Sequence, residues 1–226
     1  MFEKWRIARA KKRAATSVEE YLNQLPVTFS ATLQDTKVLS LDLETSGFNA
    51  HQDRILSIAM VEIGNGGIVL SSLEYGFLRD EYVESISNIE VHGIHRDEVA
   101  SGLTVSQFLT LLLKRLSGKV LLAHNAQMDW RFLNALHKEH FQCPLFCPII
   151  DTLLIEQRRL ERKQDIISPK SLTLSACRAR YGLPEFPQHD ARNDALATAE
   201  LLLAQVAAMG GNRQVTLQDL RATIKG

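Results

Sequence analysis

Residues 37–77 read KVLSLDLETSGFNAHQDRILSIAMVEIGNGGIVLSSLEYGF, a stretch in which apolar segments alternate with turn-forming residues. The apolar segments predict three β-strands, at Lys37–Leu43, Arg54–Ile63 and Ile68–Phe77. Gly64-Asn65-Gly66-Gly67 lies between the second and third segments and is typical of a hairpin turn, because Gly and Asn tolerate positive φ. The stretch therefore predicts a sheet that opens with three antiparallel strands.

The rest of the chain alternates predicted helices with short predicted strands. After an antiparallel start, this order indicates an α/β or α+β fold in which helices flank a mixed sheet. The predicted elements are, in order, a helix at Thr104–Leu116, a strand at Lys119–Ala123, a helix at Ala126–His140, a segment too short to assign at Pro148–Ile150, a helix at Asp151–Arg162, a mobile loop at Arg162–Lys170, helices at Ser171–Tyr181 and Ala191–Ala208, and a last helix that starts at Thr216 with Asp219 completing a capping box.

The chain divides into three predicted parts: a basic helical extension at 1–35, a main domain at 36–210 and a helical tail at 211–226. The first thirteen residues carry six Lys or Arg side chains and a single acid, which favours a basic amphipathic helix. Such a helix either packs on the surface of the main domain or docks to nucleic acid or a partner protein. Both alternatives remain open at this level.

The overall composition excludes few classes of protein. The 226 residues carry 26 basic and 26 acidic side chains, a balance that counts against a protein that merely coats nucleic acid. It is compatible with an enzyme whose acidic site binds cations. The cysteines Cys143, Cys147 and Cys177 form no CxxC pair, which indicates reduced thiols in a cytoplasmic protein. No apolar stretch has the roughly 20 residues of a membrane span, so no membrane association is expected.

Two acidic residues lie at the end of the first predicted strand. Asp42 and Glu44 are two apart, so both side chains project from the same face of the strand. Neighbouring carboxylates repel each other, and they are tolerated where a cation lies between them. The pair alone is a weak signal, because this spacing also occurs by chance, and a solvated strand end is the simpler interpretation.

Two further acidic segments lie at the starts of predicted helices. His124-Asn125-Ala126-Gln127-Met128-Asp129 joins a strand to a helix, with Asn125 as the expected N-cap and Asp129 one turn inside the helix. Asp129 would then face the strand ends, where ligands bind in open α/β sheets. In His189-Asp190-Ala191-Arg192-Asn193-Asp194, Asp190 is the expected N-cap, Asp194 lies one turn inside, and His189 directly precedes the helix. Taken singly, such a histidine is usually structural or simply exposed.

Together the three segments resemble the motifs of the DnaQ-like DEDDh exonuclease superfamily, which includes polymerase proofreading subunits, RNase T and oligoribonuclease. The first is similar to the family's Asp-x-Glu followed by Thr/Ser-Gly, the second to His-Asn-Ala-x-x-Asp, and the third to His-x-x-x-x-Asp. Two departures are Met128, where the family often has an aromatic residue, and His95, where a Thr is common. Weaker similarities are His92-Gly93-Ile94, Asp151-Thr152 and Tyr181-Gly182-Leu183.

The resemblance implies an RNase H-like fold and hydrolysis of nucleic acid from the 3′ end by two divalent cations, Mg²⁺ or Mn²⁺. It also implies that Asp42 bridges both ions, that Glu44 and Asp194 complete the site of the ion that activates water, and that Asp129 holds the second ion. His189 would be the general base, since an imidazole can take up a proton near neutral pH. The product would be a nucleoside 5′-monophosphate.

Substrate contacts are expected beside these residues. The backbone at Thr45, Ser46 and Gly47 is expected to hold the terminal 3′-OH, and Phe48 or Met128 to wedge against the last base. His124 and Asn125 are further candidates for substrate binding.

Several functions stay open. They are a 3′→5′ exonuclease acting on single-stranded DNA, a proofreading-type subunit that docks to a DNA polymerase or other protein through 1–35 or 211–226, an exoribonuclease, and a non-catalytic nucleic-acid-binding module. A role in DNA repair and a homodimer are also compatible with the resemblance.

Overall fold

The computed structural model describes residues 2–12, 14–26, 28–79, 96–163 and 167–226. Its centre is a six-stranded sheet of order β3-β2-β1-β4-β5-β6. Strands β1, β4 and β5 are parallel to one another, whereas β2, β3 and β6 pair antiparallel with their neighbours. The mixed sheet of the RNase H-like fold is thereby confirmed. The strands are β1 Val38–Thr45, β2 Ile55–Gly64, β3 Gly67–Phe77, β4 Val120–Ala123, β5 Cys147–Asp151 and β6 Thr223–Lys225.

The β2–β3 hairpin closes at the predicted turn. Gly64 pairs with Gly67, and the two residues between them, Asn65 and Gly66, have φ values of 52° and 73°. Positive φ at both central positions matches the right-handed twist of the flanking strands, which explains why Asn and Gly stand there.

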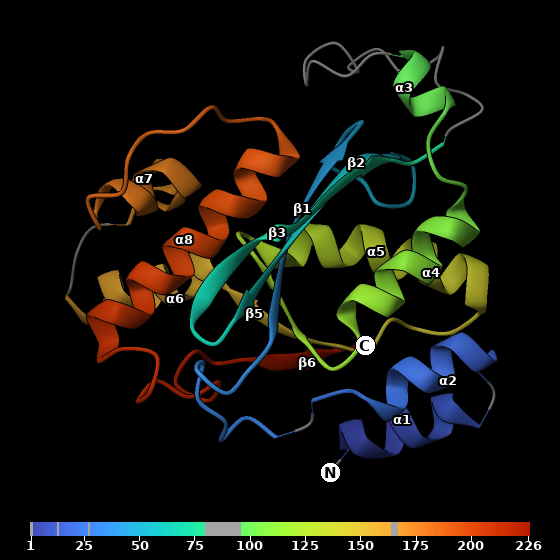
Figure 1. Cartoon of the computed structure of the whole chain (residues 1–226), viewed down its shortest axis with the longest axis horizontal. Coiled ribbons are helices and arrows are strands. Elements are labelled where there is room, and N and C mark those ends of the chain that lie inside the picture. Colours follow the sequence, from blue (N-terminus) through green and yellow to red (C-terminus); the bar gives the residue numbers. More distant parts are fainter. Residues whose placement is uncertain (1, 13, 27, 80–95, 164–166) are drawn as a thin grey trace.

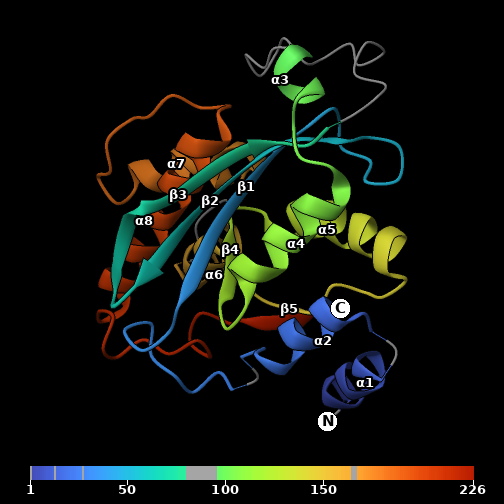
Figure 2. The same ribbon diagram turned by 45° about the vertical axis from the view of Figure 1, so that its right-hand side comes forward.

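Helices cover both faces of the sheet (Figures 1 and 2). Leu39, Leu41 and Leu43 of β1 pack toward α1, α2, α4 and α5, while the alternate residues face α8. The remaining helices are α3, α6 and α7, with the 3₁₀ turn η3 before α7. The bounds are α1 Phe2–Lys11, α2 Thr16–Asn23, α3 Arg96–Ala100, α4 Val105–Leu116, α5 Ala126–Phe141, α6 Thr152–Arg162, η3 Pro169–Leu172, α7 Leu174–Ala179 and α8 Ala191–Met209.

Helix α8 lies close to β1 because small residues face each other across the contact. Ala195 and Ala199 are fully buried, and the Ser40 hydroxyl of β1 donates a 2.7 Å hydrogen bond to the carbonyl of Ala195. This bond occupies a carbonyl oxygen of the first turns of the helix and joins it to the strand. The N-terminus of α8 is therefore held at the carboxyl end of β1.

The N-terminal helices α1 and α2 pack on the domain itself. Ile7, Val18, Leu22 and Leu25 are buried in the core that also contains the apolar residues of α4. The Tyr21 hydroxyl donates to the carbonyl of Phe146, 2.8 Å away. Of the two alternatives for 1–35, the structure therefore shows packing, and docking to nucleic acid or a partner stays a prediction.

The predicted C-terminal helix is wrong. Thr216 and Asp219 do form the two reciprocal hydrogen bonds of a capping box, but turns follow, and the chain ends in β6 beside β5. Arg221 has a φ of 56°, which ends any helical turn, and the buried side chains of Leu217 and Leu220 draw the segment into the core below α8. Burial of these leucines and pairing with the free edge of β5 thus stabilise this structure more than the local cap stabilises a helix.

Some of the residues with weaker family similarity lie where the structure is not described. His92-Gly93-Ile94 and His95 lie outside the described residues. Within the described part of the chain, no helix combines the length and apolar character needed to cross a membrane.

The packing of α2 predicts a stability effect. Leu22→Ala should lower the free energy of unfolding by about 2–5 kcal/mol, because it removes a buried side chain from the core. The matched control is Glu20→Ala on the exposed face of the same helix, which should change stability by less than about 0.5 kcal/mol. Urea denaturation measures both. Equal effects would mean that α2 is not packed in solution.

Candidate active site

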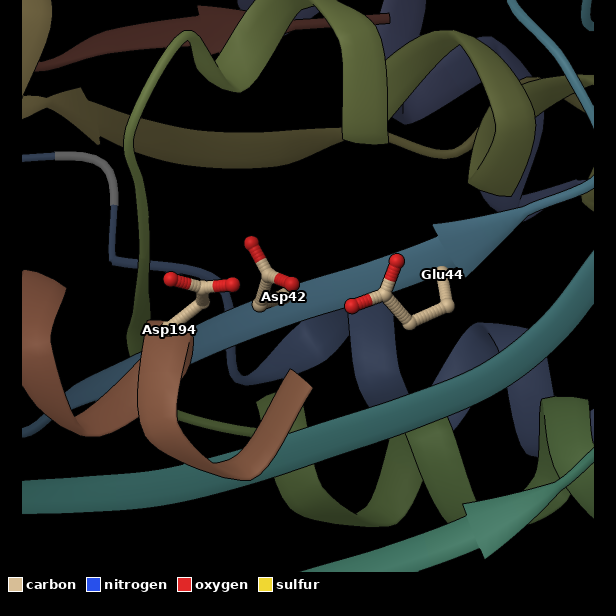
Figure 3. Close-up of side chains that lie close together, drawn as sticks. All are labelled: Asp42, Glu44 and Asp194. Carbon is tan, nitrogen blue, oxygen red and sulfur yellow. The ribbon is translucent and has the colours of Figure 1, made fainter. Parts of the chain in front are cut away.

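Three carboxylates meet where β1 and α8 come together (Figure 3). One oxygen each of Asp42, Glu44 and Asp194 lies within 4.8 Å of an oxygen of both others. Asp42 and Glu44 project from the same face of β1 as Ser40, toward α8, as their spacing predicts. Asp194 comes from the first turns of α8, next to the residue whose carbonyl Ser40 binds. The sequence-predicted pair and the third motif are therefore brought together.

The start of α8 fixes the position of Asp194. Asp190 is the N-cap, and its carboxylate accepts from the backbone N–H of Arg192 at 2.9 Å, so the predicted cap is confirmed. His189, directly before it, has a φ of 65° and donates its backbone N–H to the Asp194 carboxylate at 3.0 Å. Non-glycine residues with positive φ are uncommon and gather at functional sites. The His189 side chain is exposed, and its backbone binds one carboxylate of the group.

Asp129 approaches the strand from the opposite helix layer. It is 8% exposed, lies in the first turn of α5, and its carboxylate accepts a hydrogen bond from the backbone of Leu43 in β1. Strand β4 pairs with β1 only as far as Ser40, so this part of β1 is open to Asp129. Among the described residues, Asp129 is not in the close group of three.

Asn125 occupies the N-cap position of α5, as predicted, but its side chain does not cap the helix. Asn125 is left-handed, with φ 63° and ψ 46°, and its side chain accepts no cap hydrogen bond. The carboxylate of Asp151 instead accepts from the backbone N–H groups of Asn125 and Ala126, each at 3.0 Å. Asp151 ends β5 opposite Ala123, which places its carboxylate beneath the start of α5. Only the parallel pairing of two strands puts it there, and the Asp151-Thr152 similarity was its one signal in the sequence.

Burial and mutual repulsion dominate the electrostatics of the group. Burial, followed by the charges of Asp129 and Asp194, raises the pKa of Asp42 well above its usual range. Burial and the charge of Asp194 raise the pKa of Glu44 from its ordinary value of 4.5 to about 7. Burial also raises the pKa of Asp129, to about 7, and that of Asp194. Each group is therefore costly to ionise in the protein alone.

This donor set fits a hard divalent cation. Carboxylate oxygens are the ligands that Mg²⁺ and Mn²⁺ prefer, and a cation between them would relieve the repulsion that raises their pKa values. Asp42, Glu44 and Asp194 lie close enough together to hold one such ion.

The loop after β1 is built by its own side chains. The Thr45 hydroxyl donates to the carbonyl of Gly47 at 2.7 Å, and the Ser46 hydroxyl accepts from the N–H of Arg54 at 2.9 Å. A Cβ at Gly47 would lie 2.5 Å from the carboxylate of Asp53, so a larger residue would displace that side chain. Phe48 is 89% exposed. The loop thus exposes an apolar ring to solvent.

His124 has structural contacts that its sequence context did not reveal. Its Nδ1 lies 2.9 Å from the Thr152 hydroxyl, and its Nε2 lies 2.8 Å from the carbonyl of Leu172. Both ring nitrogens are thus engaged within the protein, and burial lowers the pKa of the ring. Met128 is half-buried and packs against the core. Substrate contacts by His124, Asn125 and Met128 stay predictions.

The repulsion predicts that Asp42→Asn stabilises the metal-free protein. Burial and the charges of Asp129 and Asp194 raise the folded-state pKa of Asp42, so its favourable contribution is present below its ordinary pKa of 3.8 and is lost as the pH rises through the folded-state pKa. Removing one charge should therefore raise the free energy of unfolding at pH 8 by roughly 1 kcal/mol, with a smaller gain at pH 4.5. Added Mn²⁺ should stabilise the wild type more than the variant.

Urea denaturation in the presence of a chelator, and then with Mn²⁺, measures these differences. The control is Glu139→Gln, which removes an exposed carboxylate from α5 and should leave stability unchanged at both pH values. A destabilised Asp42→Asn protein at pH 8 would show that the carboxylates do not repel each other.

Known proteins resemble this chain in sequence. DNA polymerase III PolC-type of Thermotoga petrophila is 26% identical over 212 residues, which cover 92% of this chain and 15% of that protein. The protein of the same name from Streptococcus thermophilus is 28% identical over 184 residues, or 80% of this chain and 12% of the relative. The chain therefore spans about one seventh of the length of these curated relatives.

Solved structures share the fold. The nuclease domain of 3′hExo, a DEDDh family member bound to rAMP, has a TM-score of 0.66 at 15% identity, over 82% of this chain and 98% of that one. Exonuclease X in complex with 5′ overhanging duplex DNA has a TM-score of 0.59 at 21% identity, over 81% and 99%.

The family model described as Exonuclease (RNase T) matches residues 39–202, a range that begins in β1 and ends in α8. It contains all five residues of the predicted DEDDh set: Asp42, Glu44, Asp129, His189 and Asp194. The chain therefore shares its fold with a DEDDh family member, and it belongs to the RNase T-type exonuclease family.

Proposed function

We propose that this domain removes nucleotides from the 3′ end of nucleic acid, with single-stranded DNA as the preferred substrate, and releases nucleoside 5′-monophosphates. The observation that carries the proposal is the group of three carboxylates, Asp42, Glu44 and Asp194, within 4.8 Å of one another at the junction of β1 and α8. Grouped carboxylates without an intervening cation are costly, so their proximity favours a metal-dependent hydrolase.

The metal ligands follow from this grouping. Asp42, Glu44 and Asp194 would hold one cation, and Asp129, which reaches β1 from α5, would hold a second together with Asp42. When bound, Mg²⁺ or Mn²⁺ ions lower the cost of forming hydroxide from water and stabilise the charge on the attacking and leaving oxygens. The protein's contribution is to fix the four carboxylates on rigid elements, a strand and two helix N-termini.

His189 accepts the proton from the attacking water. Its backbone N–H is bound to the Asp194 carboxylate, so the imidazole is carried on the same short segment that orients a metal ligand. The side chain is exposed, which leaves it accessible to water and substrate. General-base catalysis by a positioned histidine contributes about 10²–10⁴-fold to such reactions.

The loop after β1 holds the end of the substrate strand. Backbone groups at Thr45–Gly47 bind the terminal 3′-OH, and the exposed ring of Phe48 stacks against the last base. Stacking on an aromatic ring does not depend on the base, so it suits removal of any nucleotide.

A second proposal is that the domain works with a DNA polymerase as a proofreading exonuclease. It is supported by the curated relatives, which are named DNA polymerase III. Residues 1–35 or 211–226 are candidate contacts, although α1, α2 and β6 already pack on the domain. RNA is the alternative substrate.

The function is tested with end-labelled single-stranded DNA, duplex DNA and RNA, each supplied with Mg²⁺ or Mn²⁺. We expect stepwise shortening from the 3′ end, fastest on single-stranded DNA, with no reaction in chelator. Asp42→Ala should reduce the rate below a tenth of the wild type while the protein stays folded. Retention of more than that would remove Asp42 from the shared-ligand role, and a folded wild type that shortens none of the three would exclude the proposed activity.

Two variants separate the general base from a metal ligand. His189→Ala should lower kcat by about 10²–10⁴-fold with little change in the Mn²⁺ concentration needed for half-maximal rate. Asp194→Asn should raise that concentration, so that excess Mn²⁺ partly restores activity. Rate measurements across a Mn²⁺ titration distinguish the two. Rescue of His189→Ala but not of Asp194→Asn by excess metal would mean that the roles are reversed.

A further inference from the structure

A buried arginine joins α7, α8 and the segment that leads to His189. The Arg178 side chain is 3% exposed, and its Nη1 donates to the carbonyl of Ala197 in α8 at 2.8 Å and lies 2.7 Å from the Glu200 carboxylate. Its Nη2 donates to the carbonyl of Pro184 at 3.1 Å. The guanidinium carbon lies 4.8 Å from the centre of the Phe186 ring. One side chain thus contacts both the helix that carries Asp194 and the segment before it.

The segment at 183–189 lacks regular secondary structure that would fix the course of its backbone. It contains no helix or strand, and Pro184, Glu185, Pro187 and Gln188 are exposed. Its backbone hydrogen bonds lie at its ends, from the Leu183 N–H to the Arg178 carbonyl and from the His189 N–H to Asp194. Arg178 therefore binds the middle of the segment, at Pro184 and Phe186, to the body of the domain.

We propose that Arg178 is a positioning residue for His189, an inference that rests on the proposed role of His189 as the base. Ala197 lies less than one turn after Asp194 in α8. By binding Ala197 and Pro184 with the two ends of one planar group, Arg178 sets the distance between the His189 segment and the helix of the metal ligand. A lysine cannot do this, because its single ammonium has no rigid fork and does not stack flat on Phe186.

The central variant is Arg178→Lys, which keeps the positive charge beside Glu200 but loses the fork. We expect kcat to fall by about 10- to 100-fold, since misplacement of a catalytic group by about 1 Å has effects of that size. KM for a short single-stranded oligonucleotide and the Mn²⁺ concentration for half-maximal rate should each stay within about twofold of wild type.

A double-mutant cycle with His189→Ala decides whether Arg178 acts through His189. Once the imidazole is gone there is nothing left to position, so Arg178→Lys should lower kcat of the His189→Ala enzyme by less than about twofold. A residue that merely stabilised the fold would cause the same loss in both backgrounds. Equal losses, or no loss in the wild-type background, would overturn the inference.

Arg180→Lys is the matched control. Arg180 lies two residues further along, and its guanidinium binds Glu156 of α6 at 3.3 Å and the carbonyl of Ser171, not the His189 segment. Its replacement should leave kcat unchanged. If Arg178→Lys does not fold, as judged by circular dichroism, Phe186→Leu takes its place, since it removes the ring against the guanidinium but leaves the fork. It should show a smaller loss of kcat, which likewise disappears in the His189→Ala background.

The cycle also separates the two levels of inference. If His189→Ala alone leaves kcat unchanged, the proposed base is wrong and the positioning role falls with it. If His189→Ala lowers kcat but Arg178→Lys adds its full loss to it, the base stands and only the role of Arg178 is overturned.

Discussion

The contact between α8 and β1 is the constraint on which the site depends. Small side chains on both elements let the helix axis approach the strand, and the hydrogen bond from Ser40 to the Ala195 carbonyl fixes the helix along it. Only at this spacing can Asp194 lie within 4.8 Å of Asp42 and Glu44. The apolar burial on both faces of β1 offsets the repulsion that raises the pKa values of these carboxylates. The packing of α8 on β1 therefore both stabilises the sheet and brings the repelling carboxylates together.

Helix N-termini provide the second means of fixing carboxylates. Asp151 accepts from the first backbone N–H groups of α5, and Asp190 does the same for α8. Each cap defines where its helix begins, and one turn later each helix carries an acidic residue, Asp129 or Asp194. A carboxylate is favoured there by the helix dipole, which reduces the cost of its burial. The proposed metal ligands Asp129 and Asp194 therefore lie in the first turns of capped helices.

The proposed base differs from the ligands in this respect. His189 stands outside the helix, in a left-handed conformation at the end of an exposed segment. Metal ligands have to stay fixed, whereas a base has to accept a proton from water and release it between turnovers, which a position on an exposed loop allows. The buried guanidinium of Arg178 contacts both the segment before His189 and the helix that carries Asp194. The proposed base and the proposed ligand Asp194 are therefore both positioned relative to α8.

The local chemistry of the chain determined much of this. Strand alternation, the Asn65-Gly66 turn, the helix spacing and the Asp190 cap all depend on neighbours in sequence, and each was predicted correctly from them. The spacing of Asp42 and Glu44 and the place of Asp194 near a helix start are local too, and the structure brings these three carboxylates together, while their roles stay predictions. Tertiary structure alone decided the rest: Asp151, and not the side chain of Asn125, accepts from the N–H groups at the start of α5, the tail forms β6 instead of a helix, and Arg178 binds Pro184. In each case the hydrogen-bond partner comes from another element, and no periodicity along one segment can specify what a second segment brings beside it.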